Sequence, residues 1–190
     1  MTRNDAYTIL TKYITNQNLL KHSFAAEAAM KEIYDYLYST SLDPQMRETW
    51  GITGLLHDAD YEMAKGRPEV HGLLLFEKET DTIPEDIAHA VKAHNYEYTK
   101  VMPETPMDWG IACADQLTGL IVACALVHPD RKLASITPEF VVKRMKEKSF
   151  AKGADRKAIY LCEEKLGIPL EQFVAIVLRA MQKISSNLGL

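Results

Sequence analysis

The sequence has few cysteines and no basic excess, and both absences exclude classes of protein. Its three cysteines, Cys113, Cys124 and Cys162, are scattered and form no CxxC pair, which excludes a disulfide framework. Small buried thiols in a reducing, cytoplasmic setting are expected instead. The formal net charge of −4 over 190 residues excludes the broad basic surface that non-specific binding to a nucleic acid polymer needs.

The sequence also contains no obvious membrane span and no clear β pattern. Its first residues, MTRNDAYTILTKYI, contain no apolar core of the signal-peptide type. The most apolar run, 111–127, has the length of a short membrane span but contains Asp115 and Gln116. We therefore expect a buried helix there and no membrane partner.

Helical periodicity is what the sequence does contain, and no stretch alternates polar and apolar residues between turn signals. The predicted helices include 4–15, 19–38, 45–56, 138–148, 155–166 and 169–186. About eight helices in all predict an all-α fold, with one domain over 1–190 and a short C-terminal helical extension over 137–186. The apolar segment FVAIVLRAM of the last helix could pack on its own domain or on a partner, so an oligomer stays open.

The six histidines divide by helical phase into inward and outward groups. His22 shares an apolar face with Ala26, and His94 shares one with Ile87 and Val91. The inward group is His22, His57, His71 and His94, and the outward group is His89 and His128. Taken singly, each inward histidine is more often a hydrogen-bonded core residue than a ligand.

Two aspartates change that balance. Asp58 follows an apolar helix end, and Asp115 lies on the face of Ile111 and Thr118, where a carboxylate costs several kcal/mol unless it is paired or bound to a metal. No lysine or arginine lies between Asp108 and His128. A divalent cation held by imidazoles and carboxylates would satisfy all these groups, and such ligands suit Mn, Fe, Co, Ni or Zn, with Mg as a further candidate.

This ordered set of residues resembles the HD (His-Asp) domain superfamily of metal-dependent phosphohydrolases. The resemblance is carried by His22 in LLKHSFAAEAAM, His57-Asp58 in GLLHDADYE, His71 in VHGLLLFEKE, His94 in KAHNYEY and Asp115 in IACADQLTGL. It covers a core of about 19–127. The segments DQLTGLIVACALVHPD and KSFAKGADR are similar to a small bacterial subgroup.

The resemblance implies a bundle of antiparallel helices with one metal held by His22, His57, Asp58 and Asp115. In two-metal relatives extra histidines share the aspartate of the His-Asp pair, so His71 and His94 could hold a second ion. The implied activity is hydrolysis of a small phosphorylated metabolite, a nucleotide or a phosphomonoester, with metal-activated water.

Catalytic and substrate-binding roles are assigned on the same basis. We expect His57, Asp58 and Asp60 to be catalytic, although Asp60 or Glu62 could instead hydrogen-bond a ligand histidine or lie at a solvated helix end. A phosphorylated substrate needs positive charge beyond the metal. The expected substrate-binding residues are Lys65, Arg67, His94, Lys148, Lys152 and Arg156, and the alternative for each cation is an ordinary surface position.

Two other functions stay open. Ala59-Asp60-Tyr61-Glu62 replaces the Gly-Lys that commonly follows the His-Asp pair in the family, which motivates a non-catalytic module that binds a nucleotide or another ligand. Some relatives are di-iron oxygenases, and that function would need both His71 and His94 as ligands.

Overall fold

The computed structural model describes residues 1–79 and 82–190, and every regular element within these ranges is a helix. The α-helices are α1 (Arg3–Tyr13), α2 (Gln17–Leu37), α3 (Pro44–Leu56), α4 (Tyr61–Ala64), α5 (Leu74–Lys78), α6 (Glu85–Ala93), α7 (Tyr96–Thr99), α8 (Pro106–Val127), α9 (Pro138–Met145), α10 (Arg156–Leu166), α11 (Leu170–Lys183) and α12 (Ser185–Leu188). A 3-10 helix, η1, covers Leu133–Ser135. The all-α prediction is confirmed. Helices α4, α5, α7 and α12 are single turns, which the sequence pattern did not predict as separate elements.

Side-chain caps fix where the long helices begin. The Asp43 carboxylate accepts from two backbone N–H groups of α3, and a reciprocal capping box joins Thr105 and Asp108 at the start of α8. The Thr137 hydroxyl caps α9, which begins at the predicted proline but ends at Met145, three residues earlier than expected. Such caps satisfy N–H groups that the first turn of a helix leaves unpaired.

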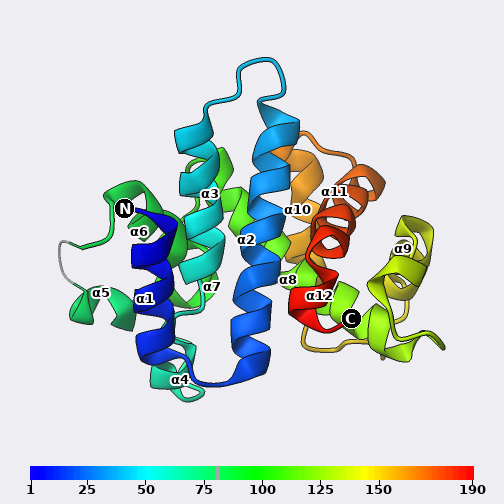
Figure 1. Ribbon diagram of the computed structural model, residues 1–190, viewed down its shortest axis with the longest axis horizontal. Helices are drawn as coiled ribbons and strands as arrows, with labels where there is room; N and C mark the ends of the chain where they lie inside the picture. Colours follow the sequence, from blue (N-terminus) through cyan, green and yellow to red (C-terminus); the bar gives the residue numbers. More distant parts are fainter. Residues whose placement is uncertain (80–81) are drawn as a thin grey trace.

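Helices α2 and α8 form the centre of the molecule. Figure 1 shows α1 and α3 on one side of α2 and the C-terminal helices α10 to α12 on the other. One buried apolar cluster joins α1, α3 and α6, and a larger one joins α2 and α8 to α9, α10 and α11. The C-terminal helices therefore share a core with the two helices that carry His22 and Asp115.

Helix α8 is long and apolar enough, by length and composition alone, to cross a membrane. In the structure 61% of its apolar window is buried inside the protein. As expected for a run that contains two polar residues, α8 is a core helix. The apolar residues of α11, Phe173 and Val177 among them, are likewise buried in the chain's own core, and the three cysteines are free and buried.

Candidate metal centre

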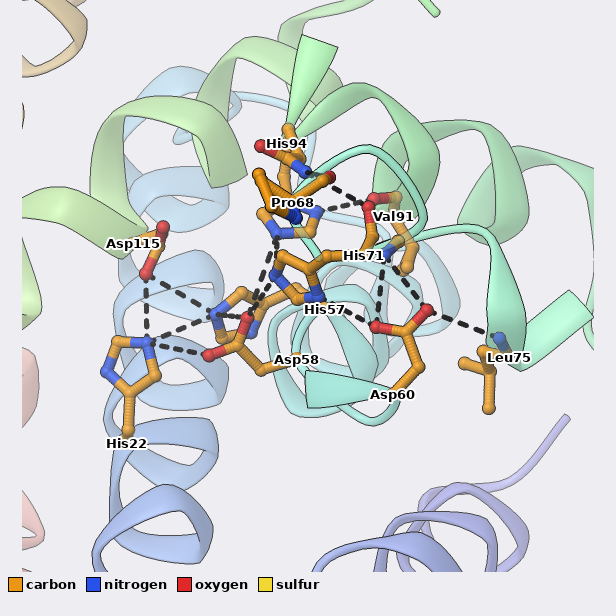
Figure 2. A network of polar contacts seen from close by, with 12 residues as sticks. His22, His57, Asp58, Asp60, Pro68, His71, Leu75, Val91, His94 and Asp115 are labelled. Atoms are coloured by element: carbon orange, nitrogen blue, oxygen red, sulfur yellow. Dashed lines mark hydrogen bonds and ion pairs between the residues drawn. The ribbon is translucent and has the colours of Figure 1, made fainter. Parts of the chain in front are cut away.

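Five segments bring the predicted ligands to one place. His22 comes from α2, His57 and Asp58 from the end of α3, His71 from the turns before α5, His94 from the end of α6, and Asp115 from α8. Figure 2 shows these six side chains, which we call the His/Asp cluster, pointing toward one another.

A glycine makes the approach of α2 and α3 possible. A Cβ on Gly54 would lie 2.5 Å from the carbonyl oxygen of Ala26, which is closer than side-chain atoms can approach. The two backbones therefore touch at this point, three residues before His57. The close contact brings the end of α3 beside His22.

The cluster contains two groups that could each hold a metal ion, and Asp58 belongs to both. His22, His57 and Asp58 form one group, and Asp58, His71 and His94 form the other; within each, the candidate ligand atoms lie within 4.8 Å of one another. Asp58 contacts both groups, with Oδ2 3.4 Å from His22 Nε2 and Oδ1 3.6 Å from His57 Nε2 and 3.1 Å from His71 Nε2. Asp115 adds Oδ1 to the first group, 2.9 Å from His22 Nε2 and 3.4 Å from His57 Nε2.

All four histidines have Nδ1 bonded within the chain. Their Nε2 atoms are turned into the cluster (Figure 2). His57 Nδ1 donates to the Gly54 carbonyl at 2.8 Å and His94 Nδ1 donates to the Val91 carbonyl. His71 Nδ1 donates to Asp60 Oδ1 at 2.8 Å. The fourth partner is the Thr118 hydroxyl, 3.3 Å from His22 Nδ1. Such bonds on one ring nitrogen leave the other available to a metal.

The Nε2 atoms themselves are in contact. Those of His22 and His57 lie 3.2 Å apart, and those of His71 and His94 lie 3.1 Å apart. Two neutral imidazoles whose lone pairs face each other repel, so a proton or a cation must lie between them. The donor set and its orientation therefore fit a metal ion.

Protons supply that charge when no ion is bound. Burial lowers the pKa of His22, but the hydrogen bond and charge of Asp115 together with the charge of Asp58 raise it to about 9. Burial likewise opposes the charge on His71, yet Asp58 and Asp60 raise its pKa to about 10. The pKa of His94 is lowered instead, to about 4, by burial and by the neighbouring imidazoles.

The two aspartates of the cluster stay ionised. Burial raises the pKa of Asp58, but the charges of His57 and His22 and a hydrogen bond from His71 bring it well below its ordinary value. Hydrogen bonds from His22 and His57 do the same for Asp115 against its burial. Ionised carboxylates and available imidazole nitrogens are what a divalent cation binds.

Asp60 lies behind the cluster rather than in it. Its side chain is 1% exposed, and besides His71 Nδ1 its oxygens accept the backbone N–H groups of Gly72, at 2.9 and 3.0 Å, and Leu75, at 3.3 Å. Asp60 is therefore placed to orient His71, which is the alternative that the sequence left open. Glu62 instead accepts backbone N–H groups of Thr15 and Asn16.

A cavity of about 560 Å³, which we call the metal cavity, opens onto the cluster. Its lining comprises Leu19, His22, Asp58, Tyr61, His71, His94, Asn95, Asp115, Gln116, Gly119, Ala123, Ala151, Gly153 and Ala154. Sequence reasoning missed Tyr61, Asn95 and Gln116 as polar lining groups. Asn95 and Gln116 directly follow cluster residues in the sequence, and that adjacency was the available signal.

Gln116 links the cluster to the C-terminal part of the chain. Its Nε2 donates to Asp115 Oδ2 at 2.6 Å, and its Oε1 accepts from the backbone N–H of Asp155 at 2.9 Å. The loop before Asp155 contributes Ala151, Gly153 and Ala154 to the cavity wall. The C-terminal extension thus completes the cavity.

The five predicted substrate-binding cations do not line the metal cavity. Lys65, Lys148 and Lys152 are exposed, and the Arg67 guanidinium donates to the carbonyls of α4. The Arg156 guanidinium donates to the carbonyls of Phe150, Ala151 and Ala154 and so holds the loop together. Of the predicted substrate-binding residues, only His94 lines the cavity.

The two histidines predicted to face outward lie elsewhere. His89 Nδ1 is 3.1 Å from Asp108 Oδ2 at the start of α8, and His128 ends that helix. Neither lines the metal cavity. The four histidines predicted to face inward therefore all belong to the His/Asp cluster, and His89 and His128 are half-buried outside it.

A scan against family models, a search of curated proteins and a search of solved structures each find no match to the chain. The functional argument therefore depends on the geometry of the site. That geometry is an all-α fold with a His/Asp cluster compatible with an HD-type metal site.

Proposed function

We propose that the protein is an HD-type, metal-dependent phosphohydrolase that acts on a small phosphorylated metabolite, a nucleotide or a phosphomonoester. One observation carries the proposal: four histidines and two aspartates, in the order of the HD motif, converge in one cluster, and all of them except His57 line a cavity large enough for such a substrate. His22, His57, Asp58 and Asp115 would hold one ion, and Asp58, His71 and His94 a second.

A divalent cation in this donor set would polarise a phosphoryl oxygen and lower the pKa of a bound water. The chain's own contribution is to hold the ligands in place. Asp58 serves both groups through its two oxygens, and the Nδ1 bonds fix each ring. Tyr61, Asn95 and Gln116 offer the cavity polar groups that could orient a substrate.

The test begins with metal analysis of the purified protein, followed by assay of a panel of phosphoesters with added Mn or Co. We expect phosphate release that is lost in His57→Ala and in Asp58→Ala. His128→Ala is the matched control, since this histidine ends α8 and lies outside the metal cavity. If the double variant His57→Ala with Asp58→Ala still releases phosphate, the proposal is refuted.

A second candidate function is a di-iron oxygenase. It is favoured by the convergence of His71 and His94 on Asp58, with Nε2 atoms 3.1 and 3.7 Å from Asp58 Oδ1, and by the absence of lysine and arginine from the cavity lining that the structure describes. Iron-loaded protein with a characteristic absorption spectrum and substrate-dependent oxygen uptake would favour it. A metal-loaded protein whose melting temperature rises with nucleotides, but which turns none over, would indicate a ligand-binding module instead.

A further inference from the structure

A second cavity, of about 470 Å³, lies next to the metal cavity, and His22 and Gly119 line both. Lys21 from α2 lines it as well, and Val122, Leu126, Leu188 and Leu190 give it apolar walls. We call it the Lys21 cavity. Because the two cavities share lining residues, a ligand at the His/Asp cluster could extend into the Lys21 cavity.

Gly119 lies where the two cavities meet, and the packing of the protein does not require a glycine there. It is in the middle of α8, where a glycine destabilises the helix by about 1 kcal/mol relative to an alanine. A Cβ at this position would meet nothing within 4 Å. Glycine thus leaves open space one helical turn after Asp115, along the line that joins the cavities.

Among the described residues, Lys21 is a cation without a counter-charge. It is half-buried and precedes the cluster residue His22, and within 1–79 and 82–190 no hydrogen bond or ion pair to its side chain is found. Its ammonium lies beside Gly189, where an added Cβ would be 3.0 Å away. The other lysine of α2, Lys31, is paired with two glutamates. Lys21 is therefore available to an anionic group of a ligand.

We infer that the two cavities form one binding groove, in which Lys21 binds a second anionic group of a ligand whose phosphoryl end lies at the His/Asp cluster. The apolar walls favour an uncharged, apolar connecting segment. The substrate class is thus a phosphate ester that carries a second anionic group, a carboxylate or another phosphate, on an apolar chain. The assignment of the phosphoryl end rests on the proposed function.

Non-hydrolysable probes test this groove independently of turnover. We would measure binding of ω-phosphonoalkanoic acids of increasing chain length to the Mn-loaded protein by calorimetry, each against the alkylphosphonate of equal length. At the length that spans the groove, the carboxylate should tighten binding about tenfold, as a charge-assisted hydrogen bond does. Bisphosphonates of the same lengths distinguish a phosphate-like second group from a carboxylate.

Variants then assign the gain to named residues. Lys21→Met should abolish the advantage of the carboxylate and leave alkylphosphonate affinity unchanged, whereas Lys21→Arg should keep it. Gly119→Val should weaken the long probes and not methylphosphonate, because its side chain would enter the passage. Lys157→Met, an exposed lysine outside both cavities, is the control.

The outcomes separate this inference from the proposed function. If the alkylphosphonates bind but no chain length gains from a second anionic group, or if Lys21→Met keeps that gain, the groove assignment is wrong even where monoesters are hydrolysed. Lys21-dependent binding in a protein that releases no phosphate would support the groove and refute the hydrolase. If no phosphonate binds to the metal-loaded protein, the groove assignment is also overturned.

Discussion

The substitution Asp60→Asn tests how the site is built. Asparagine keeps the size of the side chain but replaces one acceptor oxygen with an N–H₂ donor and removes the charge. In the structure both oxygens face donors: His71 Nδ1 at 2.8 Å, the Gly72 N–H at 2.9 and 3.0 Å and the Leu75 N–H at 3.3 Å. The new amide must therefore oppose at least one donor with another donor.

The magnitude follows from these contacts. Hydrogen bonds to a charged group contribute about 1.5–3 kcal/mol each, and removing one partner of a buried charge pair costs about 3–5 kcal/mol. At 1% exposure Asp60 has no water to replace its partners. We expect Asp60→Asn to lower the free energy of unfolding by about 3 kcal/mol. Because the ring of His71 loses its anionic partner, metal affinity should also fall about 10- to 100-fold.

Urea denaturation of the chelator-treated protein gives the first quantity, and metal titration against a chromophoric chelator gives the second. Glu62→Gln is the matched control, because this carboxylate also accepts backbone N–H groups but does not contact a histidine. We expect it to leave metal affinity unchanged. A folded Asp60→Asn protein with wild-type metal affinity and no turnover would refute the orienting role and return Asp60 to a catalytic one.

Two further predictions concern the cluster and its scaffold. At pH 7 the pKa values of about 9 and 10 keep His22 and His71 protonated, whereas His94, with a pKa of about 4, is neutral. Filling both metal sites should therefore release about two protons, measurable by calorimetry in buffers of different ionisation enthalpy. These raised pKa values stabilise the metal-free chain fully below pH 6.5, and the contribution is lost as the pH rises through 9 to 10. Gly54→Ala should lower the free energy of unfolding by about 1–3 kcal/mol, because its Cβ would lie 2.5 Å from the Ala26 carbonyl oxygen; a urea midpoint equal to wild type would contradict this close contact of α2 and α3.

The fold and the His/Asp cluster were predictable because each depends on a local pattern. Helical phase alone separates His94, with Ile87 and Val91 on its face, from His89 on the polar side. A buried carboxylate without a nearby cation, as at Asp115, already predicts a partner from elsewhere in the fold. The sequence could not show that Asp58 serves both histidine groups, because that requires the relative positions of α3, α6 and α8.

The positions of the cations could not be predicted in the same way. A guanidinium close to a loop in sequence can donate its hydrogen bonds to that loop's own carbonyl oxygens, as Arg156 does to Phe150 and Ala151. The periodicity of the sequence does not predict such bonds. The sequence did not predict Lys21 as a substrate-binding residue, because it follows no glycine-containing loop and belongs to no basic run. Its availability depends on α12 and α8, which are distant in sequence and form the other walls of its cavity.

The charge that a ligand would meet differs between the metal cavity and the Lys21 cavity. A ligand's phosphoryl group at the cluster would meet bound cations and imidazoles, because the described lining of the metal cavity contains no lysine or arginine. A bound metal ion would interact almost equally with any phosphoryl group. It would therefore contribute affinity but would select little among phosphate esters. Selection then depends on what the rest of the molecule meets, and beyond Gly119 it meets apolar walls and Lys21. A ligand with no second anionic group would leave that ammonium unpaired, which is a physical basis for discrimination against simple monoesters.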